Sequence, residues 1–121
     1  MFWMKKIFAL KFWKMNIEEI REYALSLDDV MESFPFGNET LVFKTNNKIF
    51  LLGSLSAETL QFNVKCNPER AVELREEYSC ILPGYHMNKK HWNTIIIDGQ
   101  LSKKQLQEFI RHSWTLVAKK K

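Results

Sequence analysis

The sequence predicts an α+β (α/β) domain, with an antiparallel sheet and helices packed on one face of it. Apolar residues recur at helical spacing, and two of the helical segments begin with a capping box. Apolar and polar residues alternate along a strand candidate, which indicates a sheet with one solvated face. Short connections between consecutive strands favour antiparallel pairing. The expected order of elements is about α-β-β-β-α-β-β-α.

The first helix is predicted from Asn16 to about Leu27. Its apolar residues recur every three or four positions, at Ile17, Ile20, Ala24 and Leu27. Asn16 and Glu19 form a capping box, and Met15 and Ile20 can form the accompanying hydrophobic staple. Helix breakers then follow at Asp28, Asp29, Ser33, Pro35 and Gly37.

Three strands are predicted after this helix. Thr40 to Lys44 and Lys48 to Leu52 are rich in β-formers, and Asn46-Asn47 between them suits a tight hairpin because Asn tolerates positive φ. In the third strand, Leu60 to Cys66, the alternation gives an apolar set (Phe62, Val64, Cys66) and a polar set (Gln61, Asn63, Lys65). We expect the polar face to be open and to serve as a binding surface.

The second helix is predicted from Asn67, its N-cap, to about Tyr78, with Pro68 at the first helical position. Pro83-Gly84 then predicts a turn. The next segment, Tyr85 to Lys90, is interpreted as either a short strand or an ordered loop.

The last strand is predicted at His91 to Ile97, and Asp98-Gly99 ends it. The last helix follows a capping box formed by Ser102 and Gln105. Its residues expected in the core are Leu106, Phe109, Ile110, Ser113 and Val117.

The composition is that of one globular domain. The chain has 121 residues, of which 45% are hydrophobic and 26% charged, which excludes disorder, collagen and coiled coil. No apolar run approaches the ~18 residues of a membrane span. Two cysteines are too few for a disulfide scaffold. The sequence therefore predicts a soluble, cytoplasmic protein.

Charge is unevenly distributed along the chain. The net charge of +4 divides into +4 for residues 1–14, −6 for residues 15–80 and +6 for residues 81–121. Residues 1–14 interleave lysines with aromatic side chains. They are interpreted as an N-terminal extension that is either not native or disordered, or else as a basic amphipathic segment for a membrane or nucleic acid. One domain is predicted over residues 15–121.

Motifs for catalysis and cofactor binding are missing from the sequence. The four glycines are isolated at turns, so neither a dinucleotide-binding loop nor a P-loop can be built. Cys66 and Cys80 do not form a C-x-x-C pair, and the histidines lack metal-ligand spacing. Cys66 lies on an apolar strand face, where a thiol is usually inert. His112 is expected to face solvent. We expect no enzyme activity, no metal and no cofactor.

The densest polar and aromatic cluster is Gly84 to Asn93. Its side chains suit phosphate contact at Lys89 and Lys90, hydrogen bonding at Asn88 and Asn93, and stacking at Trp92 or Tyr85. These features favour a nucleic-acid contact. The alternative is that Trp92 and Met87 fill the core while the lysines are only solvated.

Several segments resemble the MmcQ/YjbR family of small bacterial proteins. They are SFPFG at 33–37, LVFK at 41–44, NVKCNPERA at 63–71, LPGYHMNKKHWNT at 82–94 and HSW at 112–114. The segment at 82–94 is the most specific of these. The resemblance covers Met15 to about Ala118.

The resemblance implies a frataxin-like (CyaY-like) fold and DNA binding through a double wing of hairpins. The wings would be the loops around Asn46-Asn47 and Gly53 to Thr59. The contact residues carried over are Lys44, Lys65, Lys89, Lys90, His91, Trp92 and Asn93. The alternation of the strands independently gives Lys44 and Lys65 polar positions. Because residues 15–121 have zero net charge, we expect a local, salt-sensitive patch.

Three functional hypotheses follow. The first is a DNA-binding module in which phosphates are contacted by Lys44, Lys48, Lys65, Lys89 and Lys90. The second is a protein- or small-molecule-binding adaptor without catalysis, for which a closed pocket around His86, His91 and Trp92 would be the sign. The third, by fold analogy, is a frataxin-like iron binder that uses an acidic ridge on the first helix, at Glu18, Glu19 and Glu22. The simpler interpretation of that ridge is a solvated helix face.

Overall fold

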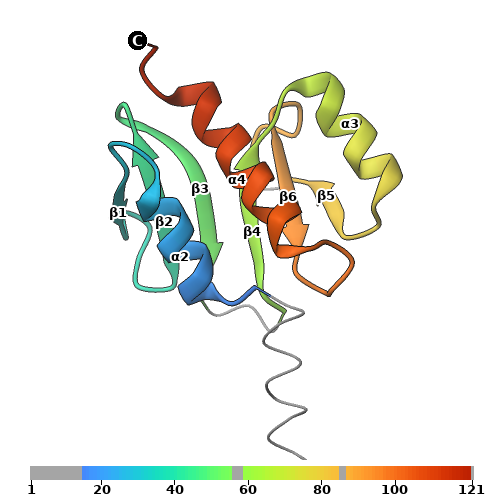
Figure 1. The fold of residues 1–121 in the computed structure, drawn as a ribbon, viewed down its shortest axis with the longest axis horizontal. Helices are drawn as coiled ribbons and strands as arrows, with labels where there is room; N and C mark the ends of the chain where they lie inside the picture. Colours follow the sequence, from blue (N-terminus) through green and yellow to red (C-terminus); the bar gives the residue numbers. More distant parts are fainter. Residues whose placement is uncertain (1–14, 56–58, 85–86, 121) are drawn as a thin grey trace, which may run out of the picture.

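A six-stranded antiparallel sheet and a layer of helices on one of its faces form the fold (Figure 1). The computed structural model describes residues 15–55, 59–84 and 87–120. The strands follow the order β1-β2-β3-β4-β6-β5 across the sheet. The predicted fold class is confirmed. Among the described residues, helices with the length and apolarity that a bilayer crossing requires are not found.

The helices are α2 (Ile17–Ser26), α3 (Pro68–Glu77) and α4 (Lys103–Val117). The strands are β1 (Met31–Ser33), β2 (Thr40–Thr45), β3 (Lys48–Ser54), β4 (Gln61–Lys65), β5 (Ile81–Pro83) and β6 (Trp92–Ile96). Figure 1 shows the helices on the same side of the sheet, with α4 crossing it between α2 and α3. We call this side the covered face and the opposite side the open face.

Each helix begins after its predicted capping residue. The Asn16 side chain accepts from the backbone of Glu19, and the Ser102 side chain accepts from the backbone of Gln105; both are complete capping boxes. Asn67 caps α3, with proline in its first turn. The turn between β2 and β3 has positive φ at both of its central asparagines, Asn46 and Asn47, as the hairpin prediction requires.

The main core lies between the helices and the covered face. Its largest buried side chains include Phe43, Phe50 and Phe62 of the sheet. Helix α4 contributes the five residues predicted from its sequence, Leu106, Phe109, Ile110, Ser113 and Val117. Burying one large apolar side chain stabilises a fold by about 1.5–3 kcal/mol, so this layer supplies most of the folding energy.

Two strands lie where the sequence predicts loops or turns. β1 has only three residues, too few for a visible alternation, and forms through its pairing with β2. β5 ends at Pro83, which is tolerated because β5 is an edge strand. The strand before β6 is β5, and the described part of the uncertain segment, Met87 to Lys90, is not a strand. Tyr85 and His86 lie outside the described residues, as do residues 1–14.

Gly84 marks a close approach between the end of β5 and β6. Its N–H donates to the Trp92 carbonyl at 3.0 Å. A Cβ atom on Gly84 would lie 2.9 Å from the Trp92 Cβ and 3.2 Å from the Trp92 carbonyl oxygen. Only glycine fits here, because a side chain would push β6 and Trp92 away.

Candidate functional site

Strand register places Lys44 and Lys65 near one end of the open face. Lys65 of β4 pairs with Trp92 of β6, and Lys44 of β2 pairs with Ile49 of β3. Since β3 separates β2 from β4, the two lysines lie about 10 Å apart across the sheet. Among the described strand residues, the positions that face this side include no Asp or Glu. Positive charge at this end is therefore not neutralised from within the sheet.

Lys48 lies on the other side of the sheet from these lysines. It pairs with Thr45, whose buried hydroxyl donates to the Asp28 carbonyl on the covered side. Its neighbour Ile49 packs on the open face, and successive side chains point to opposite faces. The structure therefore separates Lys48 from the group in which the sequence placed it.

Trp92 forms a small apolar cluster on the open face. Its ring packs with Val42 and Leu52, and Ile49 and Met87 lie beside them. Only 7% of Trp92 is exposed, and the Lys65 Nζ lies 5.5 Å from the ring centroid. We call this cluster the Trp92 ridge. The ring is a packing element that also holds the Lys65 ammonium, and it leaves little surface on which a ligand could stack.

Asn93 points to the covered face and is 1% exposed. Its Nδ2 donates to the Ala71 carbonyl at 3.4 Å, and its Oδ1 has no partner among the described residues. The family resemblance placed Asn93 on the contact surface. Its burial between β6 and α3 does not fit contact with a ligand on the open face.

The loop before β6 carries the remaining predicted residues. Lys89, Lys90 and His91 are exposed. Asn88 organises the loop: its Oδ1 accepts from the Lys90 N–H at 2.9 Å, and its carbonyl accepts from the His91 N–H at 3.1 Å. Arg75 of α3 donates to the Lys89 carbonyl at 3.0 Å. These bonds fix the backbone of the loop and leave its cationic side chains at the surface.

A recess of about 480 Å³ opens at the end of β4. Lys65, Asn67, Asn88 and His91 provide its polar lining, and Trp92 forms part of its wall. It joins the end of β4, the start of α3, the end of α4 and the loop before β6. We call this recess, together with Lys44, Lys89 and Lys90, the basic end of the open face. Cationic and amide groups around an open recess suit an anionic ligand.

Helix α4 fixes the backbone of this end from the covered face. The Ser113 hydroxyl accepts from the Lys65 N–H at 2.8 Å and donates to the Phe50 carbonyl. Ser113 is fully buried, and this one side chain satisfies a backbone group of each of two strands. The sequence predicted Ser113 only as a core position.

His112 supports the same region. Its Nε2 accepts from the Asn67 N–H at 3.3 Å, and Asn67 caps α3. Burial, and to a lesser degree the charge of Arg70, lowers the pKa of His112, which keeps the ring neutral and able to accept. The expectation that His112 faces solvent is wrong, because the ring is half-buried between α4 and the start of α3.

A larger hollow of about 630 Å³ lies farther along the open face. Its hydrogen-bonding lining consists of Thr40, Ser54, Gln61, Asn63 and Thr94, and its apolar lining of Phe36, Leu52, Leu82 and Met87. None of the described residues in this lining carries a charge. Leu52 and Met87 also belong to the Trp92 ridge, which borders the hollow on the side of the basic end. The polar set of β4 was the sequence signal for this hollow.

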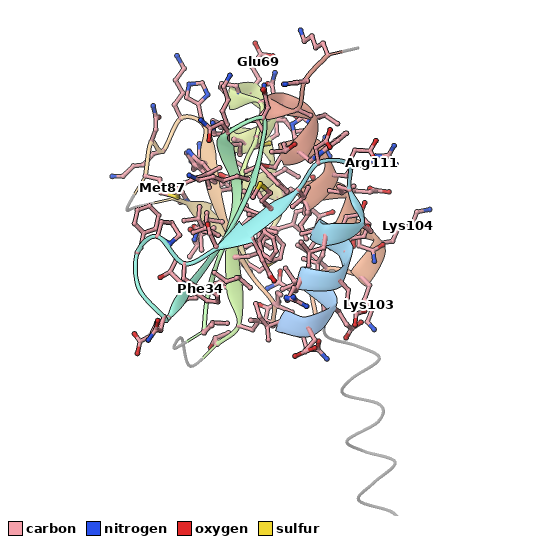
Figure 2. All side chains as sticks on the ribbon, turned by 90° about the vertical axis from the view of Figure 1, so that its left-hand side faces the viewer. Phe34, Glu69, Met87, Lys103, Lys104 and Arg111 are labelled. Atoms are coloured by element: carbon pink, nitrogen blue, oxygen red, sulfur yellow. The ribbon has the colours of Figure 1, made fainter. Side chains whose placement is uncertain are left out.

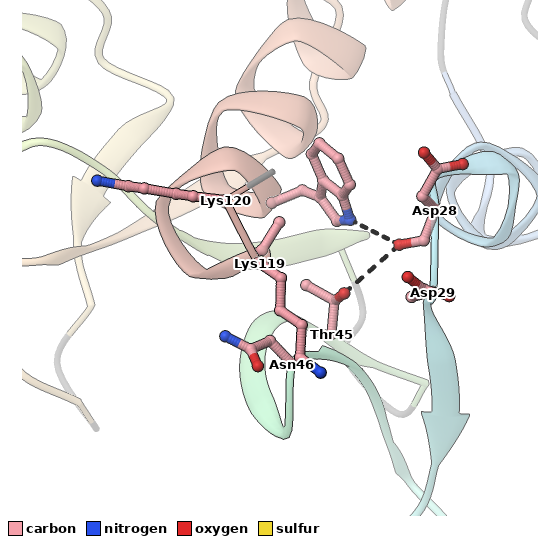
Figure 3. Close-up of a pocket in the computed structure, with 8 residues that line it drawn as sticks. Asp28, Asp29, Thr45, Asn46, Lys119 and Lys120 are labelled. Atoms are coloured by element: carbon pink, nitrogen blue, oxygen red, sulfur yellow. Dashed lines mark hydrogen bonds between the residues drawn. The ribbon is translucent and has the colours of Figure 1, made fainter.

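A third depression, of about 740 Å³, lies where the end of α4 meets the β2–β3 hairpin (Figure 3). The Asp28 carbonyl accepts there from the Trp114 Nε1 at 3.0 Å and from the Thr45 hydroxyl at 3.4 Å. Asn46 donates to the Val117 carbonyl at 3.1 Å, which ties the predicted hairpin wing to α4. The charged side chains of the lining are Asp28, Asp29, Lys119 and Lys120. The charges of this depression are of both signs, and its polar groups bond to one another. We therefore interpret it as a structural contact between α4 and the hairpin.

The geometry gives little support to thiol or metal chemistry. Cys66 and Cys80 are buried, and burial raises the pKa of both thiols. On the acidic ridge, Glu19 pairs with Lys103. Among the described residues, no group of three or more His, Cys, Asp or Glu side chains could hold a metal ion. The iron-binding hypothesis therefore lacks an assembled ligand set at Glu18, Glu19 and Glu22.

These features define a two-layer α+β domain with a basic end and an uncharged hollow on its open face. The chain belongs to the YjbR family: the family model described as YjbR matches residues 25–116. The MmcQ/YjbR resemblance of the sequence is confirmed.

Relatives are similar to this chain over most of their own length. The chain is 39% identical over 100 residues to the uncharacterized protein YbdF of Escherichia coli O157:H7, covering 83% of this chain and 82% of YbdF. It is 26% identical over 100 residues to the uncharacterized protein YjbR of Escherichia coli K12, covering 83% and 85%.

Solved structures have the same fold. The crystal structure of the Deinococcus radiodurans protein DR2400, a DUF419 domain, is similar with a TM-score of 0.81 and 38% identity, covering 87% of this chain and 80% of DR2400. A crystal structure of a Pseudomonas syringae protein has a TM-score of 0.74 and 27% identity, covering 85% and 99%.

Proposed function

We propose that this YjbR-family protein is a DNA-binding module that contacts phosphates through the basic end. One observation carries the proposal. Lys44, Lys65 and the exposed loop at residues 89–91 gather at one end of a sheet face whose described strand positions hold no acidic side chain. Lysines bind phosphates by releasing condensed counterions, and this needs local rather than overall positive charge.

The proposed contact set is smaller than the sequence indicated. Trp92 and Asn93 are buried, so they support the site rather than contact DNA. Lys48 could reach only a ligand that wraps around the hairpin tip. The phosphate contacts are therefore assigned to Lys44, Lys65, Lys89 and Lys90, with His91 beside the recess.

The test compares equal losses of charge on the two faces. In Figure 2, Lys104 and Arg111 lie on the side opposite Met87 and Phe34. The site variant is Lys44→Gln with Lys65→Gln, and the matched control is Lys104→Gln with Arg111→Gln. Glutamine keeps much of the aliphatic stem and removes the charge. Binding of the full chain to fluorescein-labelled duplex DNA is measured by anisotropy across a salt series.

If each lysine contacts one phosphate, the site variant lowers the slope of log affinity against log salt by about 1.8. The control leaves the slope unchanged. Equal effects of the two variants would show diffuse attraction and contradict the site. A third variant replaces all four lysines of residues 1–14 with glutamine; complete loss of binding in this variant alone would assign binding to that segment instead.

A second candidate is an adaptor for a protein or small molecule, and the hollow of about 630 Å³ is the observation that favours it. The recess contains His91 and Trp92 but is open, and His86 lies outside the described residues. A melting temperature that rises with uncharged heteroaromatic compounds, in a protein that binds no DNA, would favour the adaptor.

A further inference from the structure

We propose that the DNA ligand is single-stranded and that one of its bases enters the hollow on the open face. The inference rests on the DNA-binding function proposed above and specifies the form of DNA. The described lining of the hollow offers hydrogen-bonding groups and apolar walls but no charge. A nucleobase has the matching properties, because it is a flat, uncharged ring with donors and acceptors along its edge.

Amide groups of β4 are available in the hollow. The Asn63 Oδ1 accepts from the Thr94 hydroxyl, which leaves the Asn63 amide N–H groups for another acceptor. The Gln61 amide has no hydrogen-bond partner within the part of the chain that the structure describes. Both side chains are half-buried on the sheet floor. Amides of this kind form hydrogen bonds with the edges of unpaired bases.

An exposed aromatic ring stands beside these amides. Phe36 lines the hollow and is 64% exposed, and Phe34 in the same loop is 48% exposed. Figure 2 shows Phe34 on the open side of the molecule, as is Met87. Aromatic side chains that remain exposed beside a polar floor provide a surface on which a base can stack.

The spacing along β4 connects the hollow to the basic end. Asn63 and Lys65 are two residues apart, so they share the open face and are separated by about 7 Å. This is comparable to the length of one sugar and its phosphate. A base held at Asn63 would therefore carry its phosphate toward Lys65. In a duplex the bases are paired and stacked, and none could enter the hollow without being flipped out.

The experiment compares the two forms of DNA on the full chain. The probes are a fluorescein-labelled oligothymidine of about 15 nucleotides and a mixed-sequence duplex of equal length. Phe36→Ala removes the stacking ring from an exposed position, and Asn63→Leu removes the amide at nearly constant volume. Leu25→Ala, an exposed apolar residue of α2, is the matched control. Melting temperatures confirm that each variant folds.

We expect the oligothymidine to bind at least tenfold more tightly than the duplex, and Phe36→Ala to reduce its affinity on the order of tenfold. Duplex affinity should not change in Phe36→Ala, and Leu25→Ala should change neither. Equal affinity for the two probes, or an oligothymidine affinity unaffected by Phe36→Ala, would overturn this inference while leaving DNA binding intact. If neither probe binds, the proposed function fails as well.

Discussion

The covered and open faces of the sheet use the same strands for different purposes. In β4, Phe62 and Val64 are buried against the helices, whereas Gln61, Asn63 and Lys65 stand on the open side. The alternation assigns every second residue to the core and leaves the others for a ligand. Most substitutions on the open face should therefore change binding more than stability, and the reverse should hold on the covered face.

The Trp92 ridge is the exception to this division. It is an apolar cluster on the side that the helices leave uncovered, and it lies between the basic end and the hollow. The ridge gives Lys65 a surface to lie on. The contribution of the ridge to the free energy of unfolding therefore tests whether the open face serves binding alone.

The largest effect is expected from the matched pair Phe62→Ala and Trp92→Ala. Loss of Phe62 leaves a cavity in the main core and should cost about 4 kcal/mol of unfolding free energy. Loss of Trp92 should cost about 3 kcal/mol, because its ring is buried too, although next to solvent. Urea denaturation measures both. An unchanged stability in Trp92→Ala would mean that the ring is not a packing element.

Gly84→Ala should lower the free energy of unfolding by about 1–3 kcal/mol, because the added methyl group overlaps the backbone and Cβ of Trp92 on the open face. Gly99→Ala is the contrasting variant, since an added Cβ there meets nothing within 4 Å and only its positive φ opposes the change. Thermal unfolding of both variants separates steric overlap from backbone strain. A neutral Gly84→Ala would contradict the close approach.

Ser113→Ala should cost about 2 kcal/mol, because it leaves the Lys65 N–H and the buried Phe50 carbonyl without their partner. The change is on the covered face, yet it should also weaken DNA binding through Lys65. Ser113→Thr keeps the hydroxyl and serves as the control for its loss. Reduced stability with full DNA affinity would show that the two faces are independent at this point.

Lys89→Ala with Lys90→Ala should lower the salt slope of DNA binding by about 1.8 while leaving the melting temperature unchanged. Both side chains are exposed, so their loss removes charge without opening the core. Anisotropy and differential scanning fluorimetry on the same samples provide the two readings. Unchanged affinity would remove this loop from the contact set.

The smallest effect concerns His112. Burial lowers its pKa in the folded state below its ordinary value of about 6.5, so below that pH the unfolded chain binds more protons. The stability contributed by this site is therefore complete above about pH 6.5 and falls as the pH is lowered. His112→Gln keeps an acceptor that does not titrate. Urea unfolding from about pH 7.5 to 5.5 should show a weaker pH dependence in the variant, and identical curves would contradict the assignment.

Local signals predicted much of this fold. The capping boxes and the apolar period define α2 and α4, and the two asparagines define the hairpin. The alternation in β4 predicted which residues face solvent. β1 and β5 escaped prediction because each has three residues and owes its existence to a partner strand.

The candidate site was less predictable, because a small irregularity in a strand changes the face of the sheet to which its side chains point. In β3 the register with β2 shifts, so that Phe43 pairs with Leu51 while Lys44 pairs with Ile49. The extra residue at Phe50 breaks the alternation, so the residues before it face opposite to what counting back from Leu52 would give, and this places Lys48 on the covered side. Likewise, only the packing of α3 against β6 reveals that Asn93 is buried.

The two shortest strands also bear on edge-to-edge pairing between copies of this chain. β1 and β5 are the edges of the sheet, and each has three residues. Short edges expose few unpaired backbone groups, and Pro83 removes one donor from β5. The sheet can therefore leave one broad face open while offering neighbouring chains little backbone along which to extend it and aggregate.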